Sequence, residues 1–245
     1  MAVEGSFDDA GYAGNKVLRA LPTDSRQRLL SVAQPVHLGS GDMVYWATEP
    51  IEHVLFPLDG VISIVSALHE GTISEVGTIG REGMVGVSVI LGLDRAFMGA
   101  MSQVPGLSLR VPASSLTHEL AQSGEARMVF NRYVSAFLTH ISQTAACNMI
   151  HSANQRLAAW LLATHTRVRQ DRFQLTHELL SVMLGVRRAT VSELAANLQE
   201  RGIIQYHRGV MTVTDRSALE EESCECLFTV IEEYNRMLPG DSPTL

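Results

Sequence analysis

The run from Glu125 to Ile150 contains neither glycine nor proline, and it constrains the fold more than any other segment. Apolar residues recur in it at the spacing of one helical turn, which predicts a single amphipathic helix. Its 26 residues would span about 39 Å, longer than one small domain. Such a helix is either a core helix of one chain or a spine on which two protomers pack, and we favour the second. The predicted dimer interface consists of Phe130, Tyr133, Val134, Phe137 and Ile141.

Glycine divides the chain into two unlike parts. Eleven of the 19 glycines lie between Gly39 and Gly106, whereas glycine is scarce from Ala113 onward. Short runs of β-type residues separated by glycine turns are typical of an antiparallel sandwich, roll or barrel. The runs expected to be strands are Met43–Trp46, Val54–Leu58, Val61–Ser66, Ile73–Ile79, Met84–Val89 and Leu107–Val111.

The two parts together predict an α+β protein. A short helix is expected over Leu21–Ala33, a second helix after the spine over Ala153–Arg167, and a last, acidic helix over Ser217–Leu238. We divide the chain into a flexible tail (1–19), a β-roll (20–119), the long helix (120–150), a helical domain with a hairpin (151–222) and a C-terminal helix and tail (223–245).

The segment LTHELLSVMLGVRRATVSELAANLQERGII, which begins at Leu175, is the strongest functional signal. It predicts two short helices, the first with Thr176 as its N-cap, joined by a tight turn at Gly185. Glycine tolerates the positive φ that such a turn needs. Two β-type runs around His207-Arg208-Gly209 then form a hairpin, which makes the unit a winged helix. The alternative is an ordinary helical hairpin with solvated arginines.

In a winged helix, the first turns of the second helix reach base edges in the major groove. Arginine pairs with guanine or phosphate through two hydrogen bonds, and an arginine at the wing tip is suited to a phosphate. The predicted DNA-binding residues are Thr176, Arg187, Arg188, Thr190, Ser192 and Arg208.

The charge distribution agrees with this interpretation. The chain has a net charge of −7, which alone argues against a nucleic-acid partner. Between Arg156 and Val213, however, eight arginines face four acids, so that this segment carries +4 and the rest of the chain −11. A positive module on an acidic body is typical of a DNA-binding regulator.

The order of a glycine-rich roll, a long helix and a winged helix resembles the CRP/FNR family of bacterial transcription regulators. The most specific match is GVRRATV from Gly185 to Val191, and Gly39-x-Gly41 and Phe56-x-Leu58-x-Gly60 fit the roll more loosely. The resemblance implies a cyclic-nucleotide-binding-like sensor domain, a dimerisation helix and a winged helix-turn-helix. It also implies a homodimer that binds an inverted-repeat operator in double-stranded DNA, with RNA polymerase as a further partner.

Two residues in the second helix of the winged helix, the recognition helix, depart from the family's pattern. Family members commonly carry an acidic residue after the arginine, suited to accept a hydrogen bond from cytosine, and here Ala189 stands in that place. A later basic position is here Glu193. We therefore expect Arg188 to read guanine within an operator that differs from those of the best-known members.

The sensor also departs from the family. Cyclic-nucleotide binders carry a Gly-Glu pair for the ribose and an Arg followed by Ser or Thr for the phosphate. Here Gly86 is followed by Val87 and Ser88, and Arg95 is followed by alanine. We do not expect cyclic AMP or GMP binding. The effector is unassigned, and its weak candidate contacts are Gly86, Ser88 and Arg95.

Other chemistry is not expected. The three cysteines, Cys147, Cys224 and Cys226, are too few for an iron–sulfur cluster and are interpreted as ordinary helix residues, the last two pointing in different directions on one helix. No histidine lies in a haem motif, and no phosphate loop or hydrolase motif occurs. The prediction is no enzyme, no catalytic residue, no metal and no cofactor.

The apolar runs and the N-terminal residues predict the compartment in which the protein resides. No apolar run approaches the roughly 18 residues of a membrane helix, and the first residues lack a secretory pattern, so we expect a cytoplasmic protein without a membrane partner. Two alternatives to a sensing regulator stay open. One is a constitutive DNA-binding regulator whose roll senses nothing, and the other is a cyclic-nucleotide-responsive adaptor that binds no DNA.

Overall fold

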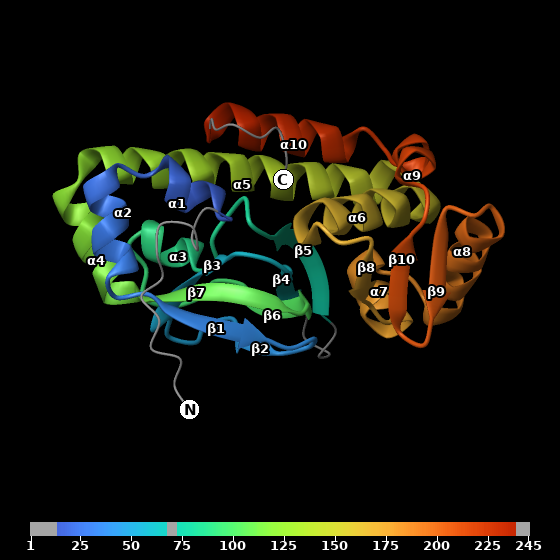
Figure 1. Ribbon diagram of the computed structural model, residues 1–245. Coiled ribbons are helices and arrows are strands. Elements are labelled where there is room, and N and C mark those ends of the chain that lie inside the picture. Colours follow the sequence, from blue (N-terminus) through green and yellow to red (C-terminus); the bar gives the residue numbers. More distant parts are fainter. Residues whose placement is uncertain (1–13, 68–72, 239–245) are drawn as a thin grey trace.

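Helix α5 (Gly124–Ile150) runs the length of the molecule, and the other elements are arranged around it (Figure 1). The computed structural model describes residues 14–67 and 73–238, so residues 1–13 and 239–245 of the predicted tails lie outside the described residues. A β-roll packs under the N-terminal two thirds of α5, and a winged domain follows its C-terminal end. Helix α10 (Cys226–Met237) returns along α5.

The roll consists of two antiparallel sheets. One has the order β1-β7-β3 and the other β2-β6-β4-β5. Their strands are β1 (Gln34–Leu38), β2 (Met43–Tyr45), β3 (His53–Pro57), β4 (Val61–Ala67), β5 (Ile73–Ile79), β6 (Gly99–Val104) and β7 (Gly106–Pro112). The helices around them are α1 (Lys16–Ala20), α2 (Thr23–Leu30), α3 (Val87–Ile90) and α4 (Ala113–Gln122).

The apolar face of α5 packs against the roll. The phenolic hydroxyl of Tyr133 donates to the carbonyl oxygen of Met84 at 2.6 Å, and the ring of Phe130 lies 6.5 Å from that of Phe56. Gly83 permits this approach, because a Cβ there would lie 2.7 Å from the Tyr133 ring. The long helix is therefore fixed to the roll by packed aromatic rings over several turns.

The C-terminal domain is built from short elements. They are α6 (Ala153–Val168), β8 (Arg172–Gln174), α7 (His177–Leu184), α8 (Arg188–Glu200), β9 (Ile204–His207), β10 (Val210–Val213) and α9 (Arg216–Glu222). Helix α6 begins with a capping box, in which the side chains of Ser152 and Gln155 satisfy each other's backbone N–H groups. The three strands form an antiparallel sheet of order β8-β10-β9.

The predicted α+β class and the long helix are confirmed, and so are five of the six predicted strands, within one or two residues at their ends. The strand predicted over Met84–Val89 is wrong: Val85 makes only an isolated bridge to Leu55, and Gly86, at φ 110°, starts helix α3. Strands β1 and β6 were not predicted. The segment expected to be a flexible tail contains α1, whose Val17 and Leu18 are fully buried.

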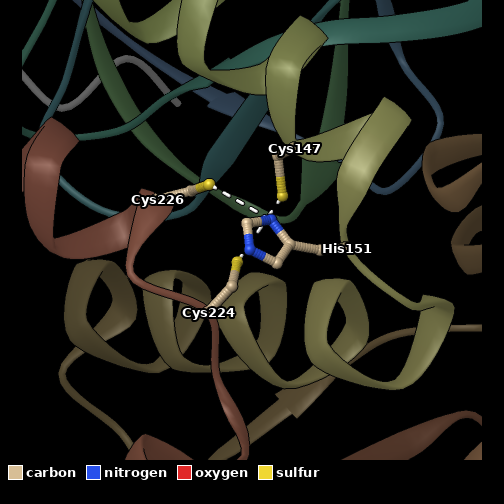
Figure 2. Close-up of side chains that lie close together, drawn as sticks. All are labelled: Cys147, His151, Cys224 and Cys226. Carbon is tan, nitrogen blue, oxygen red and sulfur yellow. Dashed lines mark hydrogen bonds between the residues drawn. The ribbon is translucent and has the colours of Figure 1, made fainter.

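The single helix predicted over Ser217–Leu238 is also wrong, because the structure has two helices, α9 and α10, separated by Ser223, Cys224 and Glu225. Cys224 therefore lies in a linker and not on one helix with Cys226. Both sulfur atoms point toward Cys147 and His151 at the end of α5 (Figure 2). None of the helices in the described ranges combines the length and apolarity that a bilayer-spanning helix needs.

Candidate nucleic-acid interface

Helices α7 and α8 meet at a tight turn. The hydroxyl of Thr176 accepts from the backbone N–H of Leu179 and caps α7, as the sequence predicted. At the other end Gly185 adopts φ 62° and ψ 34°, and the N–H of Val186 donates to the carbonyl of Ser181. This left-handed glycine ends α7 and redirects the chain into α8. Both helices bury apolar side chains: Leu180, Met183, Leu184, Val191, Ala195 and Leu198.

The start of α8 is exposed and positively charged. Arg187 occupies the cap position and Arg188 the first helical position, and both are exposed. Within the described part of the chain, neither guanidinium has a hydrogen bond or ion pair. Thr190 is half-buried in the next turn. Both arginines are therefore free to meet a partner outside the chain.

Ser192, another predicted DNA contact, is engaged within the protein. Its hydroxyl donates to the carbonyl of Arg188 at 3.1 Å and lies 3.0 Å from Nδ1 of His177. The hydroxyl has one proton, so Nδ1 of His177 is the donor to Ser192. The His177 ring stacks on Tyr206 of β9 at 4.1 Å. Burial, helped by the charge of Arg188, lowers the pKa of His177 and keeps this ring neutral.

The wing is a two-residue hairpin. Arg208 and Gly209 connect β9 to β10 with φ angles of 49° and 79°. Two successive positive φ angles are the mark of the hairpin turn that matches the twist of β-strands. Arg208 is exposed at the tip. The wing thus presents a third arginine beside the two of α8.

Comparison with known proteins agrees with this geometry. Residues 155–222 match the sequence profile of the Crp-like helix-turn-helix domain. They form a Crp-like helix-turn-helix domain. Among curated proteins, none matches the chain significantly.

Solved structures match over most of the chain. FixK2 from Bradyrhizobium japonicum is 17% identical, with a TM-score of 0.65 over 79% of this chain and 98% of that one. A CRP-family transcriptional regulator from Thermus thermophilus is 16% identical, with a TM-score of 0.64 over 77% and 96%. The c-di-GMP-responsive regulator CLP from Xanthomonas campestris is 13% identical, with a TM-score of 0.59 over 78% and 99%. The chain therefore has the fold of CRP/FNR regulators, with a cyclic-nucleotide-binding-like roll before its Crp-like domain.

The three candidate effector residues do not form a nucleotide site. Gly86 and Ser88 line a cavity of about 10 Å³, which the side chains of Tyr45, Phe97 and Phe137 close. A ligand site is usually about 300–1,000 Å³. Arg95 lies outside this cavity, is exposed, and donates to the carbonyl of Thr48 at 2.8 Å.

The predicted dimer residues of α5 lie inside the protomer. Phe130, Tyr133, Val134 and Phe137 are at most 9% exposed, and Ile141 is partly buried. They pack on the roll and on α10. The exposed face of α5 carries other residues: Met128, Ser135, Leu138, Ser142, Ala145 and Met149.

Sequence reasoning missed the contact between the Crp-like domain and the roll. Arg167 of α6 is 2% exposed and binds Glu82 of the roll through Nε and Nη2, at 3.1 and 2.9 Å. Its Nη1 donates to the hydroxyl of Thr78 at 2.8 Å. Burial alone would raise the pKa of Glu82, but the charge and hydrogen bonds of Arg167 lower it overall. Gly80 makes room, because a Cβ there would lie 2.6 Å from Cδ of Arg167.

A second buried acid lies in the same contact. Glu75 of β5 accepts from Nε1 of Trp160 at 3.2 Å and lies 2.6 Å from the hydroxyl of Ser63. Ser63 also lies 2.8 Å from Oε1 of Gln103, and one hydroxyl proton cannot serve both acceptors. Either a proton on Glu75 or a turned amide of Gln103, whose nitrogen has no partner among the described side chains, satisfies both bonds. Burial raises the pKa of Glu75 to about 7.

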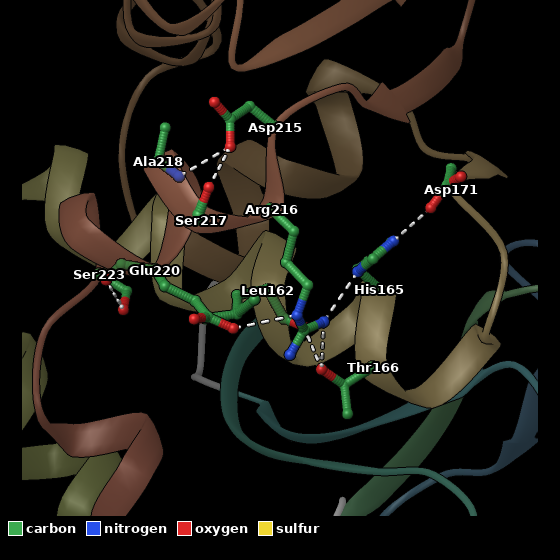
Figure 3. Close-up of polar contacts among 10 residues, drawn as sticks. All are labelled: Leu162, His165, Thr166, Asp171, Asp215, Arg216, Ser217, Ala218, Glu220 and Ser223. Atoms are coloured by element: carbon green, nitrogen blue, oxygen red, sulfur yellow. Dashed lines mark hydrogen bonds and ion pairs between the residues drawn. The ribbon is translucent and has the colours of Figure 1, made fainter.

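Polar contacts also fix α9 to α6 (Figure 3). Nε2 of His165 lies 2.8 Å from Asp171, and Nδ1 accepts from Arg216 at 2.9 Å. Arg216 also donates to Thr166 and pairs with Glu220 at 3.0 Å. This network holds the start of α9 on α6 and so sets where the following linker lies.

Proposed function

We propose that the protein is a homodimeric, sequence-specific transcription regulator that binds an inverted-repeat operator in double-stranded DNA. One observation carries the proposal: three exposed arginines, Arg187, Arg188 and Arg208, lie on the recognition helix and wing of a Crp-like domain. Arginines at these positions reach guanine edges in the major groove and the neighbouring phosphates. We expect Thr176 and Thr190 to add hydroxyl contacts, although the Thr176 hydroxyl also caps α7, whereas Ser192 is tied to His177.

The exposed face of α5 supports the homodimer. Met128, Ser135, Ser142 and Met149 recur every seven residues, with Leu138 and Ala145 between them, which is the spacing of a two-helix seam. Leu138 is 58% and Met149 87% exposed, so the protomer leaves apolar side chains in water along this face. A second copy of α5 would cover them around a two-fold axis.

The roll of this regulator does not take a cyclic nucleotide in our proposal. The cavity beside Gly86 and Ser88 is too small, and no arginine in the sequence of the roll is followed by the hydroxyl residue of a phosphate contact. The same filled cavity favours a second candidate, a constitutive regulator whose roll is structural. A thermal-shift screen of metabolites distinguishes a sensing regulator from a constitutive one. For a sensor, one ligand should raise both the Tm and the affinity for the operator.

The DNA proposal is tested by selecting sites from a random duplex library with the full chain. We expect an inverted repeat whose half-sites are about one helical turn apart. Affinity should fall with salt at a log–log slope of about −0.9 for each phosphate neutralised. A protein that enriches no sequence and shows no salt-dependent DNA affinity contradicts the proposal and favours an adaptor.

The dimer proposal is tested with two neighbouring substitutions. Leu138→Glu places like charges across the two-fold axis, so we expect folded monomers that bind the operator weakly. Phe137→Glu buries the same charge inside the protomer and should unfold it. Analytical ultracentrifugation with circular dichroism distinguishes these results. A wild-type chain that is monomeric at micromolar concentration, with and without operator, contradicts the homodimer.

A further inference from the structure

The three cysteines of the chain and one histidine converge at a single point (Figure 2). Sγ of Cys147 lies 3.5 Å from Sγ of Cys224, and Sγ of Cys226 lies 3.4 Å from Nδ1 of His151. All four donor atoms lie within 4.8 Å of one another. The three cysteines are buried and free of disulfides. Four soft donors therefore surround one small volume.

The fold brings these residues together from the end of α5 and the start of α10. Cys147 and His151 are one helical turn apart at the end of α5, so they share a face. Cys224 precedes α10, and Cys226 is its first residue. The side chain of Gln143, on α5, lies 3.2 Å from Sγ of Cys226. The network of Arg216 and His165 fixes the preceding helix, so the cluster is held from both sides.

The distances suit one tetrahedral ion. Zinc–sulfur bonds of about 2.3 Å place two tetrahedral sulfur ligands about 3.8 Å apart. The observed Sγ–Sγ separation of 3.5 Å is near this value. The Sγ–Nδ1 separation of 3.4 Å is compatible with the shorter zinc–nitrogen bond, and all four donor atoms lie within 4.8 Å of one another. A cluster of several irons holds its ligands around a larger volume than these atoms enclose. Three sulfurs and one imidazole nitrogen are the donor set of closed structural zinc sites.

The histidine is also oriented as a metal ligand. Its Nδ1 faces the sulfur atoms, and its Nε2 lies 3.2 Å from Oε2 of Glu225. A carboxylate on the second nitrogen fixes the tautomer in which the first nitrogen is free to bind a metal. The side chain of Glu225 is 76% exposed to solvent, and its carboxylate pairs with the imidazole of His151.

We propose that Cys147, His151, Cys224 and Cys226 bind one zinc ion. Binding displaces the protons of the three thiols to solvent, and the neutral imidazole completes the tetrahedron. A cavity of about 110 Å³, lined by all three cysteines, adjoins the site. The ion ties the link between α5 and α6 to the link between α9 and α10, the two points where the Crp-like domain joins the rest of the chain.

The test uses the full chain, purified under reducing conditions without a metal-binding tag. We expect one zinc per chain by elemental analysis. The reduced apoprotein should take up one cobalt(II) ion with the intense visible bands of a tetrahedral thiolate site. Removal of zinc by a chelator should expose the thiols to a thiol reagent and lower Tm.

Variants locate the ion. Cys224→Ser and His151→Ala should lose the tetrahedral cobalt spectrum, whereas His118→Ala, an exposed histidine on α4, should retain it. Glu225→Ala should weaken zinc affinity about 10–100-fold. Because Glu225 is exposed, this change leaves folding intact, and Glu221→Ala removes the same charge nearby as a control.

Three results would overturn the proposal. The first is a fully reduced chain that takes up no zinc and no cobalt. The second is cobalt uptake that Cys224→Ser and His151→Ala leave unchanged. The third is equal zinc affinity in Glu225→Ala and Glu221→Ala. None of these readouts depends on DNA, so the zinc site and the proposed function fail independently.

Discussion

Two arginines of the Crp-like domain lie in opposite environments. Arg167 on α6 is buried against the roll, with Glu82 and Thr78 as partners. Arg188 on α8 is exposed and has no partner within the described ranges. A count of charges treats the two as equal. The comparison shows that the +4 of this segment is not one basic surface, because one arginine joins the domain to the roll and the other is exposed to solvent.

Removing the buried arginine should have the largest effect. Arg167→Ala leaves the carboxylate of Glu82 buried without its counter-charge, which should cost about 3–5 kcal/mol of the free energy of unfolding. Urea unfolding followed by circular dichroism measures this loss. Arg236→Ala, which breaks an exposed pair with Glu233, is the control and should change stability by less than about 1 kcal/mol.

A double substitution sharpens the same point. Arg167→Met with Glu82→Leu removes both charges and fills similar volume, so most of the lost stability should return. Arg167→Ala should also increase proteolysis at the link between α5 and α6, since the domain loses its contact with the roll. An Arg167→Ala chain as stable as Arg236→Ala contradicts the role assigned to the buried pair.

The second buried acid predicts a dependence on pH. The pKa of Glu75 is about 7 in the folded chain, above the ordinary value of 4.5. The folded state therefore holds this proton while the unfolded state loses it, and stability falls as pH rises from about 4.5 to 7. Glu75→Gln keeps the bonds to Trp160 and Ser63 without a titrating group. Between pH 5 and 8, the free energy of unfolding should decrease in both proteins. The decrease should be up to about 3 kcal/mol smaller in the variant than in wild type.

Denaturant unfolding at both pH values checks this prediction. Groups such as Glu82 titrate in both proteins and cancel in the difference. Glu232→Gln, at an exposed position on α10, should behave as wild type. Identical pH profiles for Glu75→Gln and wild type would show that Glu75 is ionised in the folded chain at neutral pH.

The exposed arginine predicts a smaller effect, on binding alone. Arg188→Ala should cost about 1–3 kcal/mol of operator binding and relax specificity at one base pair in each half-site. Its free energy of unfolding should equal that of wild type, unlike Arg167→Ala. Binding to a library of operator variants makes the measurement, with Arg236→Ala as control. An even loss over all sequences would instead make Arg188 a phosphate contact.

Local pattern predicted the elements that local chemistry decides. The long helix, the turn at Gly185, the cap at Thr176 and the arginine-bearing hairpin all follow from residues within a few positions of one another. The inward face of α5 was recognised as apolar, but periodicity does not say which surface covers it. The roll and α10 cover Phe137, whereas Leu138, its neighbour, is exposed.

Contacts between distant segments were not predictable in this way. Arg167 and Glu82 are 85 positions apart, and Cys147 and Cys224 are 77 apart. No spacing rule joins such residues. The prediction that Cys224 and Cys226 lie on one helix was wrong, because the break between α9 and α10 turns Cys224 toward α5. Acids on both sides of Ser223-Cys224 hid that break, since a continuous polar stretch is compatible with one helix.

The return of α10 along α5 has a mechanical consequence. The Crp-like domain leaves the spine after Ile150 and rejoins it at Cys226, and the two points lie beside each other. A body attached through one flexible joint can rotate about three axes. A body attached through two adjacent joints keeps one free rotation, about the line that passes through both, and the buried pair of Arg167 with Glu82 opposes that rotation as well.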